Sequence, residues 1–329
     1  MGESDVYLKI LFCGMCHSDI HQVKNEWLNS NYPMVPGHEI VGIIEKIGSN
    51  VTKFKPGDRG AIGCMVNSCG SCKHCSVDDE QYCPKCVFTY NGKDVDGSIT
   101  QGGYSSHVVC NEKFVLKFPD NLPLDRGAPL LCAGITVFSP MKYYGLDKEG
   151  QKLAVVGLGG LGHMAVKMGK AFGMHVTVIS THDGKKEDAM TNLGADDFIV
   201  SKDEKAMAAA QGKFNGIVDT VSAEHDFGMY VSLLDTNGKY VVVGAPPEPF
   251  HVSSFSLLFK RITLGGSLIG GIKETQDMLD FCGEKNIVSD IERVPMSYVN
   301  TAMERMLRGD VKYRFVIDVE GTIEESMKA

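Results

Sequence analysis

The sequence lacks the features that mark nucleic-acid-binding, membrane-spanning and secreted proteins. It has no basic tract and a formal net charge of −8, which argues against nucleic acid or an anionic membrane as a partner. The longest apolar stretch, residues 128–138, is about half of a bilayer span. The N-terminus has no cationic segment followed by an apolar run, which argues against a secretory signal. We therefore expect a soluble, cytoplasmic protein.

Disulfide bonds are not expected either, although the chain has eleven cysteines. In a reducing compartment, cysteines in such number are thiols or metal ligands. The remaining composition, with 43% hydrophobic and 22% charged residues, is that of a globular protein, and 329 residues are enough for two domains.

The pattern of the chain changes near Cys132. Residues 5–60 alternate apolar and polar residues over short segments that turn residues separate, which indicates strands. Between residues 133 and 270, apolar strands alternate with helical stretches, the pattern of an α/β fold with a doubly wound parallel sheet. The tail predicts two helices and a closing strand, over residues 275–284, 299–308 and 314–319.

A glycine-rich turn follows the apolar strand predicted over residues 153–156. Its residues are Gly157, Leu158, Gly159, Gly160, Leu161 and Gly162, and a helix begins directly after them. Glycines permit the tight turn and let the backbone approach a pyrophosphate at the helix N-terminus. In this strand–turn–helix context we favour dinucleotide binding over a purely structural turn.

The second strand of this region, residues 176–179, should end beside the adenosine ribose. It is followed by polar and cationic residues that suit a 2′-phosphate, namely Ser180, Thr181, His182 and Lys185. Asp183 opposes this interpretation because its charge would repel a phosphate. The sequence favours NADP(H), and a solvated loop without a role in recognition is the alternative.

Two groups of residues suggest metal sites. Cys69, Cys72, Cys75 and Cys83 are spaced like the ligands of a closed, structural zinc site, with Cys86 as a competing fourth ligand and free thiols as the alternative. The second group comprises Cys16, His38 and Cys132, with Glu39 and Ser18 beside them. Three ligands leave one zinc position open for chemistry, but spacing alone does not show that they converge. The other cysteines, Cys13, Cys64, Cys110 and Cys282, are interpreted as packing thiols.

These motifs together resemble those of zinc-dependent medium-chain alcohol dehydrogenases. The resemblance rests on Gly14–Asp19, Gly37–Glu39, the Cys69–Cys83 series, Leu131–Thr136 and the Gly157–Gly162 turn. It is closest to the plant cinnamyl alcohol dehydrogenase-like branch and extends over nearly the whole chain.

The resemblance implies a GroES-like catalytic domain and a Rossmann NADP(H)-binding domain. The first would comprise residues 1–132 and 271–329, with a structural zinc loop over 69–83, and the second residues 133–270. It also implies a homodimer joined through the cofactor domains. The resemblance implies further N-terminal strands, so we expect either a truncated catalytic domain or a lobe that is built differently, with an unpaired sheet edge next to the Cys16 strand as the consequence of truncation.

The resemblance also assigns roles to individual residues. It implies a catalytic zinc on Cys16, His38 and Cys132, with Glu39 as an outer carboxylate or an exchanging ligand. It implies a proton relay through Ser18, His21 and Glu26. The cofactor contacts that it implies are Ser18, Thr136, the residues of the Gly157–Gly162 turn, Ser180, Thr181, His182, Lys185, Thr220, Gly244, Ser267, Leu268 and Ile269.

The substrate pocket implied by the resemblance contains Phe88, Cys64 and Leu268. Lignin-type members place Trp where Phe88 stands and Phe where Leu268 stands, so a terpenoid or a broad range of aromatic and allylic aldehydes fits as well as a cinnamyl aldehyde. We expect hydride transfer between NADP(H) and a bulky conjugated aldehyde or primary alcohol, with two zinc ions per subunit. The alternatives are an NADPH-dependent reductase of an iminium or conjugated C=C bond, or an inactive truncated homologue.

Overall fold

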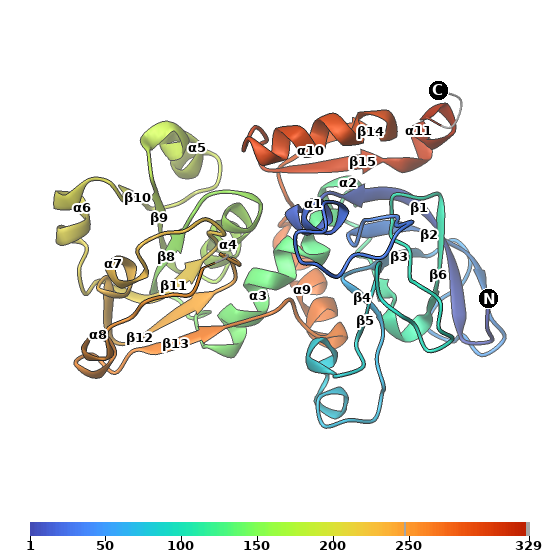
Figure 1. The fold of residues 1–329 in the computed structure, drawn as a ribbon, viewed down its shortest axis with the longest axis horizontal. Coiled ribbons are helices and arrows are strands. Elements are labelled where there is room, and N and C mark those ends of the chain that lie inside the picture. Colours follow the sequence, from blue (N-terminus) through green and yellow to red (C-terminus); the bar gives the residue numbers. More distant parts are fainter. Residues whose placement is uncertain (247, 327–329) are drawn as a thin grey trace. The chain divides into compact units, whose positions relative to one another are not determined.

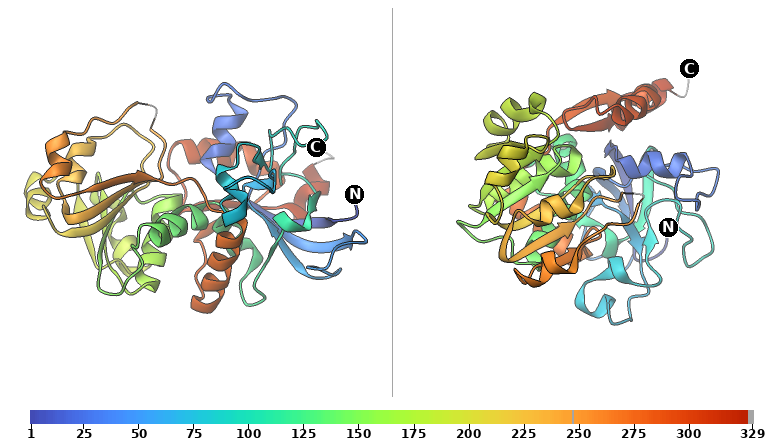
Figure 2. Two further views of the ribbon diagram at one scale, coloured as in Figure 1. Left: turned by 90° about the horizontal axis from the view of Figure 1, so that it is seen from below. Right: turned by 60° about the vertical axis from the view of Figure 1, so that its left-hand side comes forward.

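The computed structural model describes residues 1–246 and 248–326 (Figures 1 and 2). The chain forms two compact units. One consists of Met1–Ile135 and the segment that starts at Ile269, and the other of Thr136–Leu268. No helix within these described residues is long and apolar enough to cross a membrane.

The first unit is built on a seven-stranded sheet in the order β14-β15-β1-β2-β3-β7, with β6 paired to β1. The strands are β1 (Asp5–Gly14), β2 (Ile40–Ile47), β3 (Arg59–Ile62), β6 (His107–Asn111), β7 (Leu116–Lys117), β14 (Ile291–Pro295) and β15 (Arg314–Asp318). Except for β14 on β15, the pairs in this sheet are antiparallel. The expected β-rich, GroES-like part of the fold is confirmed.

Strand β1 lies in the middle of this sheet. Along it, buried residues, including Val6, Leu8 and Ile10, alternate with partly exposed ones. It pairs with β2 along one side, and with β6 and β15 in turn along the other. The prediction of an unpaired edge next to the Cys16 strand is therefore wrong. The strands that cover β1 come from sequence positions far beyond it, so a local pattern could not reveal them.

Helices and short elements complete the first unit. They are α1 (His17–Val23), the hairpin β4 (Met65–Asn67) with β5 (Val87–Phe88), α2 (Leu124–Gly127), α9 (Ile272–Lys285), α10 (Val299–Leu307) and α11 (Val319–Ser326). Helix α3 (Ala133–Tyr143) begins in the first unit and continues into the second. The predicted tail helices and closing strand correspond to α9, α10 and β15, whereas α1, β14 and α11 were not predicted.

The second unit is a parallel six-stranded sheet in the order β10-β9-β8-β11-β12-β13. Its strands are β8 (Lys152–Val156), β9 (His175–Ser180), β10 (Asp197–Val200), β11 (Phe214–Asp219), β12 (Leu234–Val242) and β13 (Thr263–Gly266). Its helices are α4 (Gly160–Ala171), α5 (Lys186–Thr191), α6 (Glu204–Ala209), α7 (Phe227–Val231) and α8 (Ser254–Leu258). The predicted α/β fold with a parallel sheet is confirmed.

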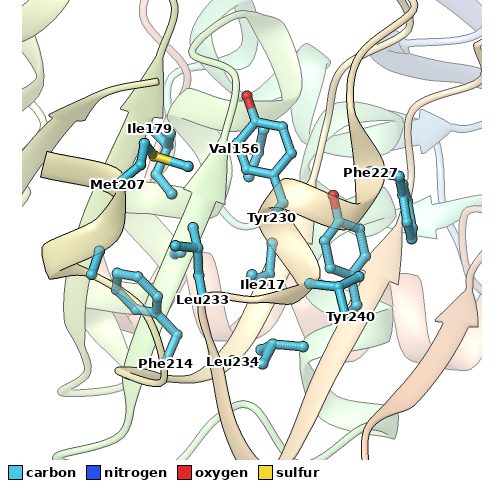
Figure 3. Close-up of a cluster of buried hydrophobic side chains, with 13 residues drawn as sticks. Val156, Ile179, Met207, Phe214, Ile217, Phe227, Tyr230, Leu233, Leu234 and Tyr240 are labelled. Atoms are coloured by element: carbon cyan, nitrogen blue, oxygen red, sulfur yellow. The ribbon is translucent and has the colours of Figure 1, made fainter. Parts of the chain in front are cut away.

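One face of this sheet carries a hydrophobic cluster that includes Phe214, Phe227 and Tyr240 (Figure 3). The Phe227 and Tyr240 rings lie 4.2 Å apart. The Tyr240 hydroxyl donates a hydrogen bond of 2.9 Å to the buried carboxylate of Asp219. This contact satisfies a polar group at the end of β11, the strand that leads to Thr220.

The Tyr240→Phe variant is expected to be less stable than the wild type by about 2 kcal/mol, because a buried carboxylate loses a donor. Urea unfolding followed by circular dichroism measures this change. The matched variant Tyr143→Phe, at a position that is 81% exposed, should leave the unfolding midpoint unchanged. Equal stability of both variants would contradict the assignment.

Candidate active site

Cys16, His38, Glu39 and Cys132 form one buried cluster in the first unit. One ligand atom of each lies within 4.8 Å of the others. Cys16 joins β1 to α1, His38 and Glu39 precede β2, and Cys132 precedes α3. The fold thus brings together residues that the sequence separates by more than a hundred positions. Their role as metal ligands stays a prediction.

The donor set suits zinc. The Cys16 and Cys132 sulfurs are 3.9 Å apart, too far for a disulfide. Two thiolates on one tetrahedral zinc ion lie about 3.8 Å apart, given a Zn–S distance of about 2.3 Å. Interaction with the Cys132 thiol, together with the Arg314 cation, lowers the pKa of the Cys16 thiol well below its usual value, despite its burial. The cluster can therefore supply the thiolate that zinc requires.

Asp19 orients the histidine of this cluster. Its buried carboxylate faces His38 Nδ1 at 3.1 Å, which leaves Nε2 as the ring nitrogen for a metal. The same carboxylate accepts hydrogen bonds from the Cys16 and Gly37 amides and from the Tyr104 hydroxyl, at 2.9, 3.1 and 3.1 Å. Sequence reasoning missed Asp19. Its position three residues after Cys16, typical of a capping box, was the available signal.

Glu39 forms an ion pair with Arg314, which β15 contributes. Both side chains are buried. Burial raises the pKa of Glu39 to about 7, although the Arg314 charge opposes this. Only one carboxylate oxygen contacts Arg314; within the described part of the chain, Oε2 has no hydrogen-bond partner. This unpaired oxygen is compatible with both roles considered for Glu39, an outer carboxylate or an exchanging ligand.

Ser18 lies beside the cluster, with its hydroxyl oxygen 3.6 Å from the Cys16 sulfur. His21 follows one turn later on α1, on the same side of the helix. His21 Nδ1 is hydrogen-bonded to Glu26, and this bond lowers the pKa of the Glu26 carboxyl. The two relay residues reach the surface, since their side chains are 33% and 44% exposed. The relay itself stays a prediction.

The four cysteines of the predicted structural zinc site, Cys69, Cys72, Cys75 and Cys83, converge on the loop between β4 and β5. Cys75 lies 3.9 Å from Cys69 and 3.6 Å from Cys72, measured between sulfurs, again the spacing of thiolates on one zinc ion. Cys83 belongs to this cluster, whereas the competing Cys86 contacts the Met65 sulfur at 3.8 Å. Hydrogen bonds lower the pKa of Cys69 to about 6, and the bond from the Ser71 amide contributes most. A lowered pKa favours the thiolate form, which is the form that binds zinc.

The glycine turn of the second unit joins β8 to α4. Gly157 has φ +87°, and a Cβ at Gly162 would lie 2.1 Å from the Gly157 carbonyl oxygen. Thr220, at the end of β11, donates to the Val156 carbonyl at 2.8 Å and so supports the turn. The geometry is that of a helix N-terminus open to a pyrophosphate. Gly244 is also confined, because an added Cβ would lie 2.3 Å from the Val221 carbonyl.

The side chain of Lys185 places a positive charge beside this turn. Lys185 donates from Nζ to the Leu158 carbonyl at 2.7 Å. Ser180 is the last residue of β9, and Thr181 and His182, which follow it, are exposed. Asp183 is exposed as well, so its charge is solvated and opposes phosphate binding less than a buried carboxylate would.

The remaining predicted site residues are distributed over both units. Cys64 lies near the cluster: its sulfur is 3.7 Å from the Leu131 carbonyl, and interactions with the Cys16 thiol first and the Cys64 thiol second raise the pKa of Cys132. Phe88, on β5, is 45% exposed and stands opposite Met65. Thr136 lies buried on α3, and Leu268 is 49% exposed. Ser267, Leu268 and Ile269 follow β13. The substrate pocket of Phe88, Cys64 and Leu268 stays a prediction.

Known proteins with similar sequences identify the family to which these two units belong. Residues 2–120 match the alcohol dehydrogenase GroES-like domain and residues 160–284 the zinc-binding dehydrogenase domain. A mannitol dehydrogenase of Petroselinum crispum is 58% identical over 98% of this chain and 96% of its own length. Cinnamyl alcohol dehydrogenase 8 of Arabidopsis thaliana is 57% identical, over 98% and 90%. Vomilenine reductase of Rauvolfia serpentina is 55% identical, over 99% and 90%.

Two solved structures have the same fold. A cinnamyl alcohol dehydrogenase of Sorghum bicolor has a TM-score of 0.96 at 51% identity, over 98% of this chain and 92% of its own. The Helicobacter pylori enzyme, in complex with NADP(H), has a TM-score of 0.91 at 41% identity, over 98% and 92%. The chain thus belongs to the zinc-dependent alcohol dehydrogenase family, in the branch of the cinnamyl alcohol dehydrogenases, as its motifs predicted.

Proposed function

We propose that this chain transfers a hydride between NADP(H) and a bulky conjugated aldehyde or primary alcohol. The observation that carries the proposal is the buried Cys16–His38–Cys132 cluster, a three-ligand set that leaves one position of a tetrahedral ion open. A zinc ion held by these residues supplies a Lewis acid for the substrate oxygen. In this proposal residues 1–132 and 271–329 form the catalytic domain and residues 133–270 the cofactor domain.

The chain's own residues then move the proton. Ser18 can both accept and donate through its hydroxyl, so it can pass a proton to or from the substrate oxygen. His21 and Glu26, hydrogen-bonded to each other, continue the path toward the surface. Asp19 keeps the His38 ring in one orientation. Arg314 neutralises the charge of the Glu39 carboxylate, next to His38 in the sequence.

Lys185 supports the choice of NADP(H), because its ammonium group lies beside the cofactor turn. We expect kcat/KM to be higher with NADPH than with NADH. The Lys185→Ala variant should lower kcat/KM for NADPH about tenfold and leave that for NADH nearly unchanged, since only NADPH carries the 2′-phosphate. Steady-state kinetics with both cofactors measure this. A wild-type preference for NADH would overturn the assignment.

The names of the relatives support a conjugated substrate. Cinnamyl alcohol and 8-hydroxygeraniol dehydrogenases are among them, whereas a mannitol dehydrogenase points to a polar polyol instead. Assays of cinnamyl, benzyl and terpenoid aldehydes with NADPH should therefore give turnover, and mannitol oxidation with NADP⁺ tests the polar alternative. Turnover of mannitol alone would contradict the substrate class.

A second candidate reaction is the reduction of an iminium or conjugated C=C bond, considered because one relative is named a reductase, vomilenine reductase of Rauvolfia serpentina. That chemistry does not need the open zinc position. Removal of zinc by a chelator separates the two reactions, because aldehyde reduction should stop whereas the alternative reduction should continue. The intact Cys16, His38 and Ser18 set favours aldehyde reduction.

A homodimer joined through the cofactor domains is part of the proposal. Strand β13 is the last strand of its sheet, and its unit exposes Phe255, Leu258 and Phe259, which are 62%, 70% and 83% exposed. Exposed apolar side chains and an open sheet edge together favour a second copy as the partner. Light scattering after gel filtration should give twice the monomer mass. A cytoplasmic location is also proposed, consistent with eleven free thiols.

A further inference from the structure

The cysteine loop between β4 and β5 is joined to helix α9 through Glu80. This carboxylate, only 2% exposed, accepts a hydrogen bond of 3.1 Å from the Ile272 amide, the first residue of α9. Amides in the first turn of a helix have no partner within the helix, so Glu80 satisfies one of them. Figure 1 shows the loop, in cyan, beside the start of α9.

Backbone contact reinforces this connection. A Cβ added at Gly271 would lie 1.7 Å from the Asp78 carbonyl oxygen, so the backbones of the loop and of the α9 N-terminus touch. Gly271 has φ −67°, a conformation open to any residue. Glycine is therefore needed at position 271 because the Asp78 carbonyl leaves no room for a Cβ, and not because of the backbone conformation.

Residues 270–272 follow Ile269, whose backbone is strained. Ile269 has φ +40°, which is rare for a β-branched side chain, and it is 8% exposed. Such a conformation persists only where its surroundings enforce it. On the other side, a Cβ at Gly270 would lie 2.7 Å from the Ile135 side chain. Residues 270–272 are therefore fixed between Ile135 and the cysteine loop.

We propose that the four-cysteine loop positions the cofactor-binding segment Ser267–Ile269, with Glu80 as the positioning residue. The inference rests on the proposed function, NADP(H)-dependent hydride transfer, and on the cofactor contacts that the family resemblance implies for this segment. Cys75 and Cys83 flank Glu80, so a metal on the cysteines fixes the place of its carboxylate. The loop thus acts on cofactor affinity as well as on stability.

Two substitutions test this by different routes. Glu80→Leu removes the acceptor, and Gly271→Ala forces the loop away from α9. Both should raise the Kd for NADPH about tenfold, measured by titration of NADPH fluorescence, while zinc content stays at the wild-type value. Glu80→Gln, which keeps an acceptor oxygen, should restore most of the affinity.

The controls are Lys113→Gln, which removes the 3.9 Å ion pair of Glu80 but leaves its hydrogen bond to α9, and Gly283→Ala near the other end of α9. Both should bind NADPH like the wild type. If Glu80→Leu and Gly271→Ala lower the unfolding temperature but leave the Kd unchanged, the loop is only structural and the inference is wrong. A wild-type protein that does not bind NADPH would instead refute the proposed function.

Discussion

The Ser18→Ala variant is expected to lose most of its turnover, with kcat falling about a hundredfold or more, while it keeps its zinc. The hydroxyl lies 3.6 Å from the Cys16 sulfur, beside the cluster that is proposed to hold the reacting oxygen. Alanine removes the group that both accepts and donates the proton, but it removes no proposed ligand. The expected loss therefore lies in the chemical step. Single-turnover kinetics with NADPH and cinnamaldehyde measure that step directly.

Ser18→Thr is the matched control, because threonine retains a hydroxyl at the same position of α1. It should preserve most of kcat, and metal analysis should give the same zinc content for all three proteins. A near-normal kcat in Ser18→Ala would show that the proton takes another path, and the role of His21 and Glu26 would lose its basis.

The second large effect is expected from Arg314→Met, which should destabilise the protein by about 3–5 kcal/mol. Arg314 and Glu39 are 4% and 0% exposed, so the variant leaves a carboxylate buried without its counter-charge. The loss should depend on pH. Because Glu39 then takes up a proton more readily in the folded protein than in the unfolded chain, stability falls as pH rises. Urea unfolding at pH 5 and pH 8 measures both effects.

The double variant Arg314→Met with Glu39→Gln provides the control for this pair. It removes the buried charge as well as its partner, so it should regain most of the stability and lose the added pH dependence. If Arg314→Met alone were as stable as the wild type at both pH values, the ion pair would not be the interaction that holds β15 to the cluster.

Local patterns predicted the second unit well. The two strands predicted next to the glycine turn, residues 153–156 and 176–179, lie within β8 and β9. The turn before α4 was found because glycine spacing directly reflects a backbone that needs space and a positive φ. The helix α1 was missed because its seven residues are too few to show a helical period.

Contacts between distant residues could not be predicted in the same way. Glu39 and Arg314 are 275 positions apart, and nothing in either local sequence indicates that they meet. Asp19 is close in sequence to Cys16, but its contact with His38 depends on how β2 pairs with β1. Cys64 was interpreted as a packing thiol for the same reason. The candidate metal ligands were proposed because motifs carry them, whereas the contacts of Asp19 and Arg314 with these residues depend on the fold.

The central claim is that Cys16, His38 and Cys132 hold one metal ion with an open position. Crystals grown with zinc and NADPH, measured at the zinc absorption edge, test it directly. The account predicts two anomalous peaks per chain, one within the four-cysteine loop and one bounded by Cys16, His38 and Cys132. A single peak, at the four-cysteine loop only, would contradict it.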